Sequence, residues 1–460
     1  MLEKSEISWS WFHFCWAAVL VLILPNSVMG LFATAYSLER PLVSVDYAVV
    51  MLIFLLNQRV IGVFALIVAF SFDVLALVGQ IFPILRLSDI PYMAKFVGVA
   101  PASYQVLSVV IVLVLLAFVC AFWFRGRQRR KTEFLTCINI VIICYAVTAI
   151  FFNTEETRVW SNKERAFVSS QVIYGIDSRR TGFVESLYST GDLFGETALT
   201  AASAPLFADL PRGDDKILLI VNESWGAADK KVHLAIISPL LQMSDKLDDW
   251  KEGNIGFKGI TIEAEIRELC EAELLHFNFS GHERSLDKCV PNRMKKAGYE
   301  TFAFHGAAGL MYDRAKWYPT IGFDNTTFFE NYSWPSRCYS FPGACDVDMA
   351  NMVSKAFRSS GKIFGYWLTL NTHHYYDLRD LSVDAFNCQA FGVDVNTAAC
   401  RNFKLQHQFF SSLADIVSKP HMSGVRVMVV SDHEPRISDQ TEMHRYFQEG
   451  RIPWVSFRVR

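Results

Sequence analysis

The sequence carries little charge and no marked excess of either sign. Its 460 residues include 44 Lys and Arg against 46 Asp and Glu, a net charge of −2, so nothing in its charge favours a nucleic-acid partner. It has no internal repeat and no long low-complexity tract, which gives no sign of a repeat architecture. With 52% hydrophobic residues and a positive mean hydropathy, it is too apolar for an ordinary soluble enzyme, and we expect a membrane portion.

No Cys-x-x-Cys pair is present, so a structural zinc site is a weaker interpretation of the cysteines than disulfides. Four of the ten cysteines lie in apolar segments, whereas six lie in the polar C-terminal half, an even number typical of an oxidising compartment. Six cysteines allow fifteen connectivities. We favour pairing of neighbours: Cys270 with Cys289, Cys338 with Cys345, and Cys388 with Cys400.

A cleaved signal peptide is not indicated, because the first apolar run has no small-residue cleavage pattern and further runs follow. We expect five spans for a hydrocarbon layer of roughly 30 Å, at 11–36, 45–57, 60–85, 105–124 and 134–152. The basic loop 125–131 should stay in the cytoplasm. Five spans then place the chain after Asn153 outside, in agreement with the disulfide argument.

Three regions follow from these patterns: a transmembrane domain at 1–152, juxtamembrane amphipathic helices and a connector at 153–214, and an extracytoplasmic domain at 215–460. The amphipathic helices are expected at 168–174 and 183–188. In the last region the predicted strands lie at 217–221, 301–304, 363–370 and 425–430, and the predicted helices at 262–269, 286–297, 346–357 and 403–417. This alternation predicts an α/β domain with a largely parallel central sheet and helices on both faces.

Potential metal ligands follow two of the predicted strands. Asp432 and His433 come directly after the strand that ends at Val430, and Glu223 follows the run that ends at Asn222. The carboxyl ends of parallel strands meet at one edge of a sheet, so these groups could share a divalent ion. Taken singly, each is equally well explained as a solvated carboxylate or a structural pair.

Thr261 begins a predicted helix and could be an ordinary N-cap or a nucleophile. A helix N-terminus favours a phosphoryl group, and a divalent metal would lower the pKa of the hydroxyl. His305 and His373 could donate to phosphate oxygens or protonate a leaving alcohol, with His374 as an alternative to His373. Arg314 offers a planar donor fork for phosphate, unless it belongs to a solvated surface.

In their order along the chain, these motifs resemble those of the alkaline-phosphatase and sulfatase superfamily. The motifs are Asn222-Glu223-Ser224, Gly259-Ile260-Thr261-x-x-Ala264-Glu265, Phe304-His305-Gly306, Tyr312-Asp313-Arg314, Gly322-Phe323-Asp324, Asn371-Thr372-His373 and Ser431-Asp432-His433. The membrane-bound branch is the most similar, namely lipoteichoic acid synthases and lipid A phosphoethanolamine transferases, in which five spans precede an extracytoplasmic catalytic domain. The resemblance therefore implies an alkaline-phosphatase-like domain.

The resemblance also assigns roles. The implied ligands of a divalent metal, zinc or manganese, are Glu223, Thr261, Asp432 and His433, with Thr261 also the nucleophile. The implied substrate contacts are His305, Arg314, His373 and Tyr312, the last standing where lipoteichoic acid synthases have a tryptophan. His444 lies about where phosphoethanolamine transferases place a further histidine, and Glu434 replaces the usual glycine after Asp-His.

The function implied is transfer of phosphoethanolamine from a phospholipid, with phosphatidylethanolamine favoured, to an envelope glycan or lipid through a phospho-threonine. The location implied is the bacterial inner membrane, multi-pass, with a periplasmic catalytic domain. Thr-x-x-Ala-Glu is similar to the phosphoglycerol branch, so phosphoglycerol transfer is the alternative. A sulfatase-like hydrolase is another, although no Cys/Ser-x-Pro/Ala-x-Arg motif surrounds Thr261, and Glu434 would suit a catalytically inactive envelope-assembly protein.

Overall fold

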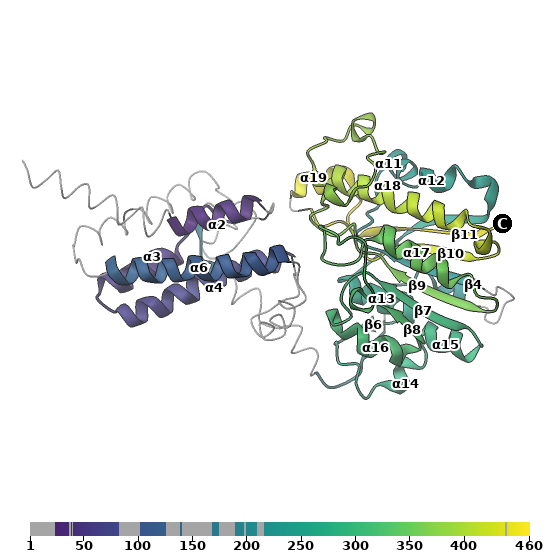
Figure 1. Cartoon of the computed structure of the whole chain (residues 1–460), viewed down its shortest axis with the longest axis horizontal. Coiled ribbons are helices and arrows are strands. Elements are labelled where there is room, and N and C mark those ends of the chain that lie inside the picture. Colours follow the sequence, from purple (N-terminus) through teal and green to yellow (C-terminus); the bar gives the residue numbers. More distant parts are fainter. Residues whose placement is uncertain are drawn as a thin grey trace, which may run out of the picture. The chain divides into compact units, whose positions relative to one another are not determined.

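The computed structural model describes residues 24–35, 38, 40–81, 102–125, 139, 168–173, 189–196, 199–208, 216–437 and 439–460. The chain divides into two compact units, Met1–Ser186 and Leu187–Arg460. Figure 1 shows a helical first unit and a second unit in which helices surround a sheet.

The first unit contains apolar helices where four of the five spans are predicted. They are α2 (Leu24–Ala35), α3 (Asp46–Leu55), α4 (Arg59–Ile81) and α6 (Ala102–Arg125). Among the described residues one helix, at Arg59–Val78, is long and apolar enough to cross a bilayer, and Gln105–Ala121 is apolar but shorter. The predicted fifth span lies almost wholly outside the described residues, so the five-span topology stays a prediction.

Two buried carboxylates tie this unit together. Asp73 of α4 accepts hydrogen bonds from Arg40 Nε at 2.9 Å and Nη2 at 2.7 Å, and from the Tyr47 hydroxyl at 2.9 Å. Asp46, the first residue of α3, accepts one from Ser170 Oγ at 2.6 Å. Paired partners are what make a charge tolerable among apolar helices, so both networks fix helix positions.

Beside Ser170, strand β1 (Val43–Ser44) pairs in parallel with β2 (Val168–Ser169). A helical turn follows at 171–173, so the amphipathic helix predicted for 168–174 begins as a strand instead. The exchange of backbone hydrogen bonds with β1 accounts for this difference. The second predicted helix, at 183–188, lies outside the described residues.

The second unit is built on a seven-stranded mixed sheet with the strand order β5-β11-β10-β4-β9-β7-β8. The strands are β5 (Leu247–Gly256), β11 (Arg451–Val459), β10 (Arg426–Ser431), β4 (Lys216–Asn222), β9 (Ile363–Leu368), β7 (Glu300–His305) and β8 (Asn325–Thr327). Strands from β10 to β8 are parallel, as predicted, whereas β11 runs antiparallel to β10 and β5. Sequence analysis predicts β4, β7, β9 and β10 but not β5, β8 or β11.

Strand β4 explains why helices cover both faces. All but its first residue are buried, with Leu218 and Ile220 in one apolar core and Ile217, Leu219 and Val221 in the other. The first core is covered by α11 (Lys230–Ile236), α12 (Ser238–Leu241), α17 (Asp346–Ala356) and α18 (Ala398–Val417); the second is covered by α13 (Thr261–Cys270), α15 (Val290–Lys296) and α16 (Arg314–Ile321) (Figure 1). A strand buried on both faces is typical of a parallel sheet.

The helix predicted for 286–297 is divided. A short helix, α14 (Glu283–Leu286), ends before α15 begins at Val290, and Pro291 occupies the first turn of α15. Proline cannot continue a helix from the preceding turn but fits the start of a new one, which explains the break.

Three disulfides join Cys270 to Cys289, Cys338 to Cys345, and Cys388 to Cys400. The predicted pairing of neighbours is therefore confirmed.

Part of the predicted connector is packed into the second unit. Strand β3 (Phe194–Gly195) pairs antiparallel with β6 (Glu273–Leu274), and the short helix α10 (Ala204–Phe207) follows. Phe207 is fully buried, with its ring edge-on to Phe364 at 5.7 Å. The connector thus contributes to the core on the α13 side of the sheet.

We expect Phe207→Ala to destabilise the second unit by about 3 to 5 kcal/mol, because it empties a buried aromatic site. Thermal unfolding of the purified full chain measures this. Phe391→Ala is the matched control, since Phe391 is 37% exposed and its loss should cost much less. Equal melting temperatures for the two variants would contradict a packed connector.

Candidate active site

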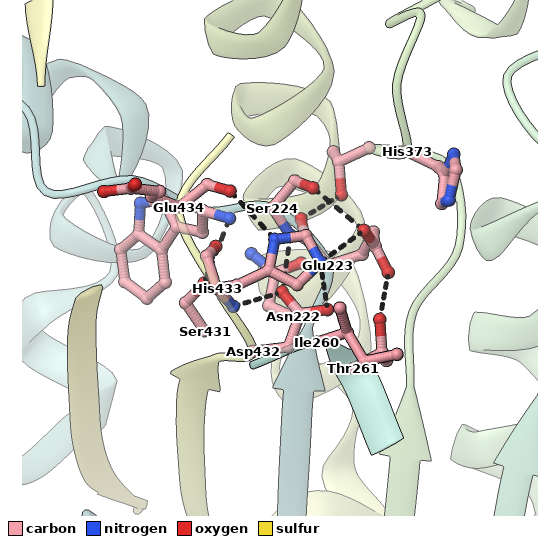
Figure 2. Close-up of polar contacts among 12 residues, drawn as sticks. Asn222, Glu223, Ser224, Ile260, Thr261, His373, Ser431, Asp432, His433 and Glu434 are labelled. Atoms are coloured by element: carbon pink, nitrogen blue, oxygen red, sulfur yellow. Dashed lines mark hydrogen bonds and ion pairs between the residues drawn. The ribbon is translucent and has the colours of Figure 1, made fainter. Parts of the chain in front are cut away.

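Four of the predicted site residues meet at the carboxyl edge of the parallel strands. Glu223 follows β4, and Asp432 and His433 follow β10, the neighbouring strand in which Ser431 is in register with Asn222. Thr261 is the first residue of α13, and Figure 2 shows it facing Glu223. The register between β4 and β10 therefore brings residues more than 200 positions apart to one point.

The distances among these groups suit a shared cation. Thr261 Oγ1 lies 3.5 Å from Glu223 Oε2. His433 Nε2 lies 3.5 Å from Glu223 Oε1 and 3.3 Å from Asp432 Oδ2. The ligand atoms of Glu223, Asp432 and His433 all lie within 4.8 Å of one another, and all three residues are buried. Carboxylate oxygens and an imidazole nitrogen are common ligands of zinc.

The hydrogen atoms around His433 leave a lone pair facing the carboxylates. Its Nδ1 lies 2.8 Å from the carbonyl oxygen of Glu434, which can only accept, so Nδ1 carries the hydrogen. Burial lowers the pKa of His433, which favours the neutral ring. Nε2 then presents a lone pair to Glu223 and Asp432. This is the tautomer of a metal-binding histidine whose other nitrogen is held by a carbonyl.

In each carboxylate, hydrogen bonds from the protein fix one of the two oxygens. Asp432 Oδ1 accepts from the backbone N–H groups of Ser224 at 2.8 Å and His433 at 2.7 Å. Asp432 Oδ2 is buried and has no hydrogen-bond donor among the described residues. Glu223 Oε1 accepts from Ser224 Oγ at 2.8 Å, leaving Oε2 toward Thr261. A buried acceptor without a donor is costly unless a cation or ligand satisfies it.

Two buried carboxylates this close also repel one another. Burial, together with the Asp432 charge, raises the pKa of Glu223 well above its ordinary value. The cluster contains only acceptors and like charges, so it fits a divalent cation.

The start of α13 leaves the Thr261 hydroxyl available. Ile260, not Thr261, is the N-cap, and Glu263 Oε2 accepts from the Ile260 N–H at 2.6 Å. Gly259 makes room for this arrangement: its φ is +80°, and a Cβ there would lie 2.2 Å from Glu263 Oε2. The alternative role of Thr261 as an ordinary N-cap is therefore wrong, because Glu263 satisfies the helix terminus instead.

His305 and His373 are both neutral acceptors at Nε2. Nδ1 of His305 donates to the Leu368 carbonyl at 3.1 Å, and Nδ1 of His373 to the His374 carbonyl at 2.7 Å. Burial lowers the pKa of His305 well below its ordinary value and that of His373 to about 3. Neither ring has a hydrogen left for a phosphate oxygen. Donation, the role predicted for them, requires an anionic phosphate nearby to raise their pKa.

Arg314 is engaged inside the domain. Its Nε and Nη2 donate to Glu265 Oε2 at 2.9 and 2.6 Å, in a buried pair on α13 and α16. The guanidinium also lies 4.9 Å from the centroid of the Tyr312 ring. Burial raises the pKa of Tyr312 to about 12, so its hydroxyl stays protonated. Arg314 is thus not part of a solvated surface: Nε and Nη2 bond to Glu265, and Nη1 lies 3.5 Å from the Met311 carbonyl.

His444 does not join the four central residues. It lies on α19 (Gln440–Tyr446), where its Nε2 is 3.3 Å from Glu449 Oε2 and its side chain is 57% exposed. Glu434, which replaces the usual glycine, accepts from the Gly450 N–H at 2.9 Å, and Figure 2 shows its carboxylate turned away from the cluster. The substitution therefore leaves the Asp432–His433 geometry intact.

Sequence analysis missed Arg436, three residues after His433. Its carbonyl accepts from His374 Nδ1 at 3.0 Å and from the Tyr376 hydroxyl at 3.3 Å, which fixes its backbone beside the site. Its charge assists burial in lowering the pKa of His373 and His433. A single arginine after Asp-His forms no periodic pattern, so its proximity to the site could be found only in three dimensions.

Among solved structures, the chain is similar to a lipoteichoic acid synthase from Listeria monocytogenes, with 17% identity, a TM-score of 0.43, and coverage of 53% of this chain and 65% of that one. It thus spans less than two thirds of that synthase. It is also similar to the lipooligosaccharide phosphoethanolamine transferase A of Neisseria meningitidis, with 13% identity, a TM-score of 0.40, and coverage of 78% and 69%. A Streptococcus pyogenes phosphoglycerol transferase gives 12% identity, a TM-score of 0.37, and coverage of 53% and 68%.

No curated protein sequence matches the chain significantly. A protein-family model does match: residues 215–449, more than half of the chain, match the family described as Sulfatase. This range contains every residue that forms the cluster described above. The chain therefore belongs to the sulfatase family, and its second unit is an alkaline-phosphatase-like sulfatase domain.

Proposed function

We propose that the chain is a metal-dependent phosphotransferase that moves phosphoethanolamine from a phospholipid to a hydroxyl of an envelope glycan or lipid. The observation that carries this proposal is the Thr261 hydroxyl, which lies 3.5 Å from Glu223 at the edge of the buried cluster of Glu223, Asp432 and His433. A hydroxyl at a helix N-terminus beside such a cluster is well placed as a phosphoryl acceptor.

The residues that would hold the ion are Glu223, Thr261, Asp432 and His433. Their oxygen and nitrogen ligand atoms fit zinc or manganese, and the buried Asp432 Oδ2, which accepts no hydrogen bond from the described residues, could bind the cation. When bound, such an ion lowers the pKa of a coordinated hydroxyl and stabilises negative charge on phosphate oxygens.

The proposed reaction is a double displacement. Thr261 Oγ attacks the phosphorus of the lipid headgroup; the Oγ–P bond forms and the bond to diacylglycerol breaks, and the Thr261 proton ends on the diacylglycerol oxygen. The acceptor hydroxyl then attacks the phospho-threonine, its proton returns to Thr261, and the headgroup is transferred. The first N–H groups of α13 point to the side of Thr261 and favour the phosphoryl group there.

The proposed substrate contacts are His305, His373 and Tyr312, with Arg314 behind Tyr312 and His444 further away. We add Arg436, because Arg314 already binds Glu265 and the phosphate needs another cation. Neutral His373 accepts a proton most readily when the phosphate charge is nearby, which suits a group that relays a proton to the leaving alcohol.

The apolar helices of the first unit and the three disulfides support a membrane-anchored enzyme with its catalytic domain in the periplasm. We therefore favour phosphatidylethanolamine as the donor. Phosphoglycerol transfer is the second candidate, since Thr261 to Glu265 has the sequence pattern of that branch.

Thr261→Ala should lower headgroup transfer by at least about a thousandfold, because it removes the covalent nucleophile. Transfer of a labelled headgroup by the purified full chain in phospholipid vesicles is the measurement, and Thr261→Ser should keep part of the rate. Thr320→Ala is the control, as Thr320 is exposed and its hydroxyl donates to the Lys316 carbonyl at 3.1 Å. Undiminished transfer by Thr261→Ala excludes this nucleophile.

Glu223→Gln should abolish metal binding and yet raise the melting temperature of the metal-free protein at neutral pH. The raised pKa of Glu223 means that its contribution to stability is complete below the ordinary value of 4.5 and is lost as pH rises through the folded pKa. The amide of glutamine does not ionise, so the variant does not lose this stability as pH rises. Glu252→Gln, at an exposed carboxylate, should change neither quantity. A Glu223→Gln protein that binds zinc normally contradicts the assigned ligand.

Mass spectrometry of envelope glycans and lipids, with and without the protein, distinguishes the two donors. We expect a phosphoethanolamine increment that disappears with Thr261→Ala. A phosphoglycerol increment would select the second candidate, and no change in any envelope component would contradict both.

A further inference from the structure

Arg267 and Glu268 form a buried ion pair in the same helix as Thr261. Arg267 Nε donates to Glu268 Oε1 at 2.7 Å, and the two side chains are 5% and 0% exposed. Neither residue belongs to the cluster at the sheet edge. A buried ion pair contributes little net stability, because desolvation offsets the attraction, so its contacts suggest a more specific role.

Arg267 reaches the backbone that carries two of the proposed metal ligands. Its Nη2 donates to the Ser431 carbonyl at 2.9 Å, and its Nη1 to the Asp432 carbonyl at 3.4 Å. These carbonyls lie where β10 ends and the chain turns to direct Asp432 and His433 into the cluster. The planar guanidinium holds both at once, which a flexible ammonium could not do equally well.

Glu268 accepts hydrogen bonds from the connector. Its Oε2 accepts from the Ser203 N–H at 2.9 Å and its Oε1 from the Ala202 N–H at 3.3 Å. Ser203 Oγ donates to the Glu268 carbonyl at 2.9 Å, and Ser203 is fully buried. The segment that follows the membrane unit in sequence is therefore bonded, through two adjacent side chains, to the loop at the site.

We propose that Arg267 is a positioning residue that aligns Asp432 and His433 with Glu223, and that the connector holds Arg267 in place through Glu268. This inference rests on the proposed metal-dependent function. Metal affinity then depends on contacts made by Ala202 and Ser203 on the far side of α13. Groups that orient metal ligands typically affect affinity about 10- to 100-fold when removed.

The test is titration of the metal-free, purified full chain with Zn²⁺ against a competing chelator. We expect Arg267→Gln to weaken zinc binding about 10- to 100-fold, with Arg267→Lys intermediate and Glu268→Gln weakened in the same direction. In the transfer assay kcat should fall more than KM changes, because the ligands, not the lipid contacts, are displaced.

Arg293→Gln is the matched control. Arg293 Nη2 also donates to a connector carbonyl, that of Phe207, at 2.8 Å, but its Nη1 donates to Glu271 and not to the loop after β10. It should therefore bind zinc like the unaltered protein even if its melting temperature falls.

Unchanged zinc affinity in Arg267→Gln overturns the inference, whatever its thermal stability, because a purely structural role would lower the melting temperature alone. Should Arg267→Gln fail to fold, wild-type affinity in both Arg267→Lys and Glu268→Gln overturns it. Failure of the unaltered protein to bind zinc or manganese would instead reject the proposed metal function itself.

Discussion

The constraint on which the site depends is electrostatic: the fold brings two buried carboxylates and an imidazole nitrogen together, a set of groups that fits a cation. Glu223 and Asp432 are buried carboxylates in mutual repulsion, and the tautomer of His433 presents a lone pair to both. A domain does not gain stability from such a cluster. Hydrogen bonds nevertheless fix each group: Ser224 donates to both carboxylates, and His433 Nδ1 donates to the Glu434 carbonyl.

Helix α13 connects nearly every part of this arrangement. Thr261 begins it, Glu265 in its second turn binds Arg314, and Arg267 and Glu268 link the β10 loop to the connector. Because a helix moves as a rigid element, displacement of α13 would disturb Thr261, the proposed nucleophile, together with the loop that carries Asp432 and His433. Its C-terminal residue, Cys270, is in turn tied to Cys289 at the start of α15.

The sequence was informative where one local pattern decides the structure. Continuous apolar runs identified β4 and β10, and the residues directly after them are the clustered ones. Strand β5 escaped prediction because its charged, half-exposed residues lack apolar alternation; pairing with β11 makes it a strand. Arg436 and the Arg267–Glu268 pair escaped because their contacts join residues far apart in the chain. No local pattern specifies which of many arginines becomes buried.

Residues 434–436 depart from the motif of the resembled family, in which a glycine follows Asp-His. The backbone contacts of this segment show that the departure does not disturb the cluster. The Glu434 side chain turns outward to Gly450, so only its carbonyl contacts His433, a contact that glycine would also make. Pro435 fills the space against Gly226, where a Cβ would lie 2.5 Å from the proline ring. Pro435 is buried and limits the conformations of the turn, and Arg436 then follows with its carbonyl held by His374 and Tyr376. The Glu434 carboxylate thus takes no part in the cluster, and Arg436, two residues further on, brings a positive charge that acts on His373 and His433.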